Sequence, residues 1–401
     1  MPNRLLPAAA ALVLLAVPLA AQNVPTRTLS KPEVEFEEPF TQLAGVRELR
    51  DGRVIAIDPR DKIVQVIDLR AATATKLGRD GSGPGEYGLP IRLLPIPGDT
   101  SAVVDILNNR ILLINPNATV GGFVESPPAE GGRGDGMMVM TSNMPTAVDS
   151  KGRFYAEGSP ITIVNGAPQS ADSVPLLRWT RTSAKRDTIA WRDLPKDANQ
   201  VTGSSRGGRG NISVRIGGGA PFQGGDQLAV APDGRVAVVR HDPYRVDYVS
   251  ETGQRTQGQP IRVDRVRVTD GHKEEWREAR RSATGISISV DNGRRSAAMV
   301  PMRDVQDPEN WGGDYMPPFL AQAASLSFSN DGYLWVRRTG PAGQAPTFDV
   351  IDRAGNLVQK VVLPNRSRVV GFGNGTVYTV RLDEDDLQYL QRHRFAMPDR
   401  P

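Results

Sequence analysis

Short apolar stretches with polar residues at every second position recur along most of this 401-residue chain. Six times, such a stretch is followed by a tight turn rich in Gly, Asp or Asn and then by a second apolar stretch. This pattern is typical of a β-hairpin, because two-residue turns need residues that tolerate positive φ. The six copies cover residues 49–58, 96–105, 148–157, 230–239, 328–337 and 371–380.

A third strand follows most of these hairpins, and a fourth follows some of them. Three or four antiparallel strands repeated around an axis form the blades of a β-propeller. We therefore predict an all-β, six-bladed β-propeller over residues 33–396. The last repeat has room for only three strands, and residues 33–38 offer a fourth. Pairing of this N-terminal strand with the final blade would close the ring and remove two exposed sheet edges.

Unequal spacing between the turn glycines reveals two insertions in the repeat. Residues 196–226 are rich in Gly, which is typical of a flexible loop. Residues 264–318 contain the segment GHKEEWREARRSA at 271–283, for which we predict a surface helix because opposite charges lie three or four residues apart. Loops added to a rigid scaffold often carry function.

The N-terminus has the pattern of an export signal. Arg4 precedes an apolar run at residues 5–19, and Ala20 and Ala21 then precede Gln22. The run is shorter than the roughly 20 residues of a membrane-spanning helix. We predict a signal peptide at 1–21, a linker at 22–32 and a C-terminal tail at 397–401. The mature chain would have no membrane span and would lie outside the cytoplasm, in the periplasm or secreted.

Composition narrows the function classes. The chain has no Cys, which excludes disulfides, thiolate metal sites and cysteine nucleophiles. Its 49 basic and 45 acidic residues are too evenly balanced to indicate a nucleic-acid partner. The 41 Gly and 32 Pro favour many turns and argue against a helical bundle.

The segment GRDGSGPGEYGLP at residues 78–90 resembles a loop of bacterial NHL-like six-bladed propellers. With the six hairpins and the export signal, residues 33–395 look like an exported branch of that NHL-like or TolB-like group. The resemblance implies the fold and leaves the activity open, since propellers include binding proteins, lyases, lactonases and scaffolds. We interpret the four residues at the centre of the loop as structural: Gly83, Pro84, Gly85 and Glu86.

One polar cluster and the end of the second insertion are candidates for ligand binding. The cluster forms a short turn between two strands and contains Arg240, His241, Asp242, Tyr244 and Arg245. The insertion ends with Trp311 and Tyr315. If both lie on one face, aromatic and charged groups meet there and suit a protein, peptide or glycan. The alternative is that the aromatic residues only attach the insertion to the ring.

Candidate metal ligands lie near the ends of second strands in four blades: Asp58, Asp105, Glu157 and Asp242. They could converge on Ca²⁺, which prefers oxygen ligands. Alternatively, they begin turns or pair with nearby Arg residues. The three His residues, His241, His272 and His393, are scattered and do not indicate zinc.

No catalytic residue is predicted. Residues 203–207 match the G-x-S-x-G string of serine hydrolases, but they lack the strand before and the helix after that the motif requires. Our leading hypothesis is a monomeric binding module without a cofactor. The alternatives are a lactonase- or lyase-like enzyme that uses a divalent cation such as Ca²⁺, and a scaffold subunit of an envelope assembly.

Overall fold

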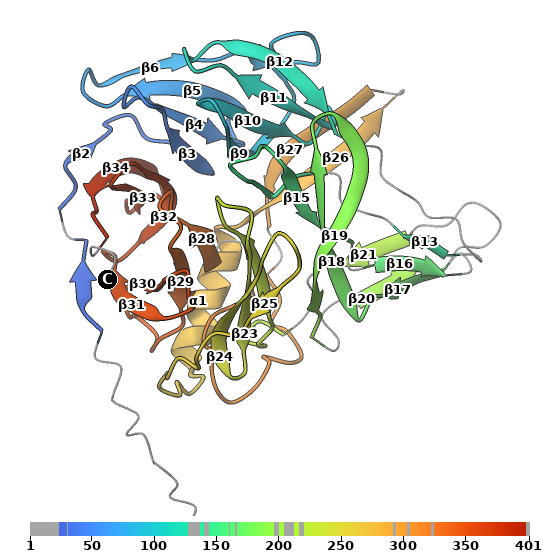
Figure 1. Cartoon of the computed structure of the whole chain (residues 1–401), viewed down its shortest axis with the longest axis vertical. Coiled ribbons are helices and arrows are strands. Elements are labelled where there is room, and N and C mark those ends of the chain that lie inside the picture. The colour runs from blue at the N-terminus through green and yellow to red at the C-terminus, as the bar shows by residue number, and fades with distance from the viewer. Residues whose placement is uncertain are drawn as a thin grey trace, which may run out of the picture.

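Six sheets surround one axis, each built on four antiparallel strands and one extended by a fifth, parallel strand, so the six-bladed β-propeller is confirmed (Figure 1). The structure is a computed structural model. It describes residues 24–29, 31–126, 137–139, 144–159, 161–164, 167–195, 200–203, 212–215, 220–291, 294–302, 305–321 and 325–397. The expected signal peptide and residues 398–401 of the expected tail lie outside these ranges.

The strands of each blade follow one another from the axis outward. Blade 1 contains β3 (Gly45–Glu48), β4 (Val54–Asp58), β5 (Ile63–Asp68) and β6 (Thr73–Lys76). Blade 2 contains β9 (Pro90–Ile96), β10 (Thr100–Asp105), β11 (Arg110–Ile114) and β12 (Val120–Glu125). Blade 3 contains β14 (Ala147–Val148), β15 (Phe154–Glu157), β18 (Ser173–Thr180) and β19 (Ser183–Asp193). Blade 4 contains β22 (Gln227–Val230), β23 (Val236–His241), β24 (Tyr244–Val249) and β25 (Arg255–Thr256). Blade 5 contains β28 (Leu326–Phe328), β29 (Leu334–Arg338), β30 (Thr347–Ile351) and β31 (Leu357–Val362). Blade 6 contains β32 (Ser367–Gly373), β33 (Thr376–Leu382), β34 (Gln388–Arg394) and, from the N-terminus, β2 (Val34–Glu35).

The N-terminal strand closes the ring as expected. β2 pairs antiparallel with β34, with Val34 opposite Arg392. The carboxylate of Glu35 accepts two hydrogen bonds from Arg381 of β33, at 3.0 and 2.8 Å. Phe36 is buried in the core shared by blades 1 and 6. Within the expected linker, β1 (Thr26–Thr28) adds a parallel strand to β31 of blade 5.

The central strands of the blades are buried on both faces. All five residues of β4 are buried, although the sequence pattern predicted alternation with polar positions. Each blade is packed between two neighbours, so both of its faces need apolar side chains. Ile55 of blade 1 belongs to a cluster with Val103 of blade 2, and Val54 to one with Tyr378 of blade 6.

The ring has two different faces. Successive strands are antiparallel, so the first-to-second turns of all blades lie on one face, which we call the turn face. Its turn glycines have φ between +66° and +87°: Gly52, Gly98, Gly152, Gly234, Gly332 and Gly375. The second-to-third connections and the blade-to-blade connections lie on the opposite face, which we call the insertion face.

Every element outside the blades belongs to a connection on the insertion face. These elements are β7 (Arg79–Asp80), β8 (Glu86–Tyr87), β13 (Met137–Val139), β16 (Ile161–Val164), β17 (Ala167–Ser170), β20 (Gln200–Gly203), β21 (Ile212–Arg215), α1 (Asp270–Arg281), β26 (Thr284–Asp291) and β27 (Arg294–Pro301). The small sheet β13–β16–β17 and the hairpin β20–β21 lie together beyond blade 3 (Figure 1). Within the first insertion, expected to be a loop, the described residues thus include a hairpin.

The predicted helix is present as α1, with Thr269 as its N-cap. His272 accepts a hydrogen bond from the Thr269 backbone at its Nδ1 atom (3.1 Å), which helps to begin the helix. Arg280 and Arg281 in the last turn complement the negative end of the helix dipole. Of the helices in the described ranges, none is long and apolar enough to cross a membrane.

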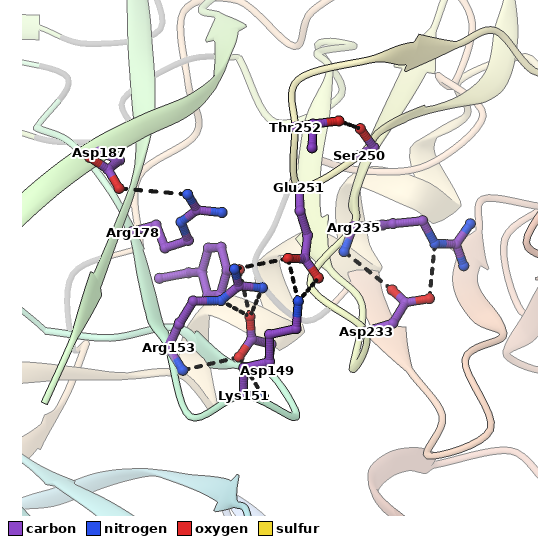
Figure 2. Close-up of polar contacts among 11 residues, drawn as sticks. Asp149, Lys151, Arg153, Arg178, Asp187, Asp233, Arg235, Ser250, Glu251 and Thr252 are labelled. Atoms are coloured by element: carbon purple, nitrogen blue, oxygen red, sulfur yellow. Dashed lines mark hydrogen bonds and ion pairs between the residues drawn. The ribbon is translucent and has the colours of Figure 1, made fainter.

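An ion-pair network joins blades 3 and 4 on the turn face (Figure 2). Glu251 of blade 4 accepts hydrogen bonds from Arg153 (3.0 Å) and Lys151 (2.9 and 2.7 Å) of blade 3. These bonds lower the pKa of Glu251 to about 2. Asp149 accepts from the Arg153 side chain and from the hydroxyl of Tyr155 (2.7 Å). The network therefore holds two blades together as a structural contact.

Candidate ligand-binding site

A pocket of about 470 Å³ opens on the insertion face, between the second insertion and blades 4 and 5. Its lining comes from four connections that are distant in the sequence. The lining residues are Phe222, Gly224, His241, Asp242, Val263, Asp264, Arg265, Gly312, Tyr315, Met316, Pro317, Pro318, Arg338 and Thr339. Three of the predicted ligand-binding residues, His241, Asp242 and Tyr315, are thus brought together.

His241, which lines the pocket, is held in place by Asp226. The Nδ1 atom of His241 lies 3.0 Å from Oδ1 of Asp226, and the His241 backbone N–H donates to the same oxygen at 3.1 Å. Arg240 donates to the other oxygen of Asp226. Burial alone would raise the pKa of Asp226, but the hydrogen bonds from His241 and Arg240 outweigh it and bring that pKa to about 2. Asp226 is therefore a fixed negative charge that orients the His241 ring.

Gly224 allows the chain to pass directly over this ring. A Cβ atom at position 224 would lie 2.5 Å from Cδ2 of His241, which is too close for any side chain. The glycine therefore lets the backbone of the first insertion cover the imidazole of His241.

Tyr315 and Arg265 form the exposed side of the pocket. The Arg265 guanidinium lies 3.9 Å from the centre of the Tyr315 ring, a cation–π contact. Tyr315 keeps 42% of its surface exposed. Arg338 lies deeper, where it donates to Asp349 (3.2 Å) and stacks on Tyr244. The pocket therefore combines an aromatic ring, two guanidinium groups and an imidazole with the apolar wall formed by Met316 and the two prolines.

Other residues of the predicted cluster support the fold instead. Tyr244 is buried, donates to Asp349 at 3.0 Å and packs against Phe319, and burial raises its pKa well above the usual value. Arg245 pairs with Asp247 at 2.9 Å, and Arg240 pairs with the same carboxylate at 3.2 Å.

Trp311 attaches the helix to the ring. Its ring stacks on Phe222 at 5.5 Å and meets the edge of Trp276 of α1 at 5.3 Å. For Trp311, the contacts fit the interpretation that the aromatic residues attach the insertion. Tyr315 instead leaves its ring open to solvent.

The candidate metal ligands are each used near their own blade. Asp58 accepts backbone hydrogen bonds from Gln42 (2.8 Å), Arg60 and Asp61. Asp105 accepts from Leu89 and pairs with Arg110. These contacts match the alternative given above, in which the carboxylates begin turns or pair with nearby arginines.

Glu157 likewise forms a two-point ion pair with Arg192 on β19, and Asp242 faces the pocket. Within the described ranges, no three His, Asp or Glu side chains are grouped in a way that could hold a metal ion. The Ca²⁺ alternative stays a prediction.

The remaining sequence motifs have local contacts. His272 caps α1 and contacts the Gly340 carbonyl at 2.9 Å, and His393 is buried beside Thr379 at 3.0 Å. Of the G-x-S-x-G string, residues 204–207 lie outside the described residues. In the loop at 83–86, Glu86 accepts from the Gly83 backbone at 2.7 Å, and Arg110 donates to the carbonyls of Ser82, Gly83 and Glu86.

Asp226, Arg265 and Arg338 were not predicted as site residues. Asp226 ends a Gly-rich insertion where no local pattern marks it, and Arg265 begins the next insertion. The sequence does contain a pattern that could have identified Arg338. It lies six residues after the turn glycine Gly332, and Arg240 of the predicted cluster lies six residues after Gly234.

No protein-family model matches the chain, and no curated protein does. Among solved structures, the chain is similar to virginiamycin B lyase from Staphylococcus aureus, with 11% identity over 92% of this chain and 89% of that one and a TM-score of 0.37. It is also similar to the calcium-binding protein regucalcin from Agrobacterium tumefaciens, with 11% identity over 94% and 99% and a TM-score of 0.38. A member of the duf4221 family from Bacteroides vulgatus matches with 8% identity over 90% and 94% and a TM-score of 0.43. These values are too low to carry an argument about function, and it is the order of its own sheets that makes this chain a six-bladed β-propeller.

Proposed function

We propose that this protein is an exported, monomeric binding module that takes a protein, peptide or glycan ligand on its insertion face. The observation that carries the proposal is the pocket beside His241, Asp242 and Tyr315. Its volume lies within the usual range of ligand sites, and it combines an apolar wall with a few polar groups that can fix orientation. An exposed aromatic ring beside a guanidinium suits stacking against a sugar ring or an aromatic side chain.

The binding proposal is tested with the mature chain labelled and applied to a peptide array and a glycan array. We expect signals on one array that fall at least about tenfold in Tyr315→Ala, because loss of an aromatic contact that contributes strongly to binding costs about 1–2 kcal/mol or more. Trp191→Ala is the matched control, since Trp191 is an exposed aromatic residue on β19, outside the pocket. Equal binding by both variants, or no signal on either array, would contradict the proposal.

Export is tested separately. The protein is expressed from residue 1 in a bacterial host, and the N-terminus of the exported form is sequenced. We expect it to begin at Gln22, because Ala20 and Ala21 are small residues before a cleavage point. Recovery of the chain only in the cytoplasm, with Met1 retained, would overturn the exported location.

A further inference from the structure

Two arginines on the innermost strands have no acidic partner among the described residues. Arg92 of β9 donates to the backbone carbonyl of Pro145 at 3.2 Å. Arg368 of β32 donates to the side-chain oxygen of Gln388 at 2.7 Å and to the backbone carbonyl of Leu43. All three acceptors are neutral. The charge of each guanidinium is therefore uncompensated in the described part of the chain.

Both arginines lie deep in the molecule, although each keeps some solvent-exposed surface. Burial lowers the pKa of Arg92, and it lowers the pKa of Arg368 to about 10. Holding a cation among protein atoms without an anion is unfavourable. By contrast, Arg47 on innermost strand β3 has a carboxylate partner, Asp99, at 2.9 Å. An arginine on an innermost strand can therefore have a carboxylate partner, whereas Arg92 and Arg368 have none among the described residues.

Strand register places the two arginines at the same level of the ring. Arg92 lies opposite Val104, one residue before Asp105, where β10 ends at the insertion face. Arg368 lies opposite Val380 of β33, five residues after the turn glycine of its blade. The first strand of a blade is the one nearest the axis. Both arginine side chains therefore extend from backbone positions at the insertion-face end of the innermost strands.

Blade 1 stands between the two blades that carry these arginines, and its equivalent residue is Gly45. Gly45 lies opposite Ile57, which is also five residues after the turn glycine of its blade. A Cβ atom at Gly45 would have one near neighbour, the carbonyl oxygen of Val370 at 3.8 Å. Blade 1 thus places no side chain at the level where its neighbours place arginines.

We propose that Arg92 and Arg368 form an oxyanion-binding site at the insertion-face end of the central ring, with Gly45 leaving room for the ligand. The ligand group is a phosphate or a carboxylate, whose oxygens match the donor geometry of guanidinium. The site is separate from the pocket beside His241, and the bound oxyanion would provide the negative charge that both arginines lack.

The test uses the mature full-length protein and two probes, inorganic phosphate and citrate. Thermal unfolding is followed in a chloride buffer, with sodium chloride at matched ionic strength as the reference. We expect Tm to rise by roughly 5 °C at saturating probe, since a ligand that binds only the folded state stabilises it. A response to one probe shows which oxyanion the site accepts, and either response supports the proposal. A rise no larger than that in sodium chloride, for both probes, would overturn it.

Variants assign the effect to the site. Arg92→Gln and Arg368→Gln should each weaken the probe at least about tenfold in calorimetric titration, because a charge-assisted bond is lost. Arg60→Gln is the matched control, since it removes the same charge from an exposed arginine on the same face. Equal weakening in Arg60→Gln would show a general charge effect and refute the site.

Gly45→Val keeps both arginines and fills the space between them, so it tests the same site if an arginine variant fails to fold. It should also weaken the probe at least tenfold, and unchanged affinity would refute the geometry. The outcome is independent of the array experiment, because Tyr315→Ala leaves this site intact.

Discussion

Asp226 should make the free energy of unfolding depend on pH in the acid range between its unfolded pKa of 3.8 and its folded pKa of about 2. Its side chain is 12% exposed and accepts hydrogen bonds from His241 and Arg240. The replacement Asp226→Asn keeps the size of the side chain and one acceptor oxygen, and it removes the charge. The effect of the variant therefore reports the ionised carboxylate.

The size of the effect follows from the pKa. The folded state lowers the pKa of Asp226 from 3.8 to about 2. Each pKa unit is worth about 1.4 kcal/mol, so the ionised carboxylate contributes about 2 kcal/mol to the free energy of unfolding at pH 7. Because the folded pKa is the lower one, the unfolded state binds the proton first as pH falls. The contribution is therefore complete above about pH 4, falls to about 1 kcal/mol at pH 3, and is lost as pH passes below about 2.

The assay is urea unfolding of the wild type and Asp226→Asn at pH 7 and pH 3. We expect the difference in the free energy of unfolding to fall from about 2 to about 1 kcal/mol between these conditions. Asp242→Asn is the control, because Asp242 is an exposed carboxylate in the adjoining turn, and it should cost less than about 0.5 kcal/mol at both pH values. A difference that stays constant with pH would refute the reasoning, since a purely steric or packing effect does not titrate.

Three further variants test other parts of the argument. Phe36→Ala should lower the free energy of unfolding by about 3 kcal/mol in urea, because Phe36 is 3% exposed and anchors the closing strand; a loss below about 1 kcal/mol would mean that the strand contributes little. Glu251→Gln should cost about 1 kcal/mol at low salt and less in 1 M salt, since its ion pairs with Arg153 are partly exposed, whereas a salt-independent loss would contradict an ionic origin. Gly224→Ala should displace the His241 ring and abolish the array signal, because its Cβ would meet that ring, and an unchanged signal would remove His241 from the site.

The fold could be predicted because its determinants are local. A turn such as Asp51-Gly52 needs positive φ, and this requirement is visible in two letters of sequence. Six such turns give six hairpins. The closing strand followed from counting strands in the last repeat, where one was missing. The helix followed from charge spacing within 12 residues of α1.

The site could be predicted only in part, because its contacts join distant segments. His241 was singled out from its own turn, whereas its partner Asp226 precedes it by 15 residues with a whole strand between them. The metal hypothesis rested on four strand ends that share one face. The sequence pattern does not show that backbone amides and Arg192 already use carboxylates such as Asp58 and Glu157.

The place of the pocket follows from the number of strands in a blade. With four strands, the chain leaves a blade on the same face by which it entered, so every blade-to-blade connection falls on the insertion face. An insertion there interrupts no hairpin and changes no packing between blades. The long insertion between blades 4 and 5 also lies beside the second-to-third connections of both blades, which begin at His241 and Arg338. Segments around residues 241, 265, 315 and 338 can therefore form one pocket, although each is unremarkable alone. A change of ligand would need new residues in these connections and no change in the ring that holds them.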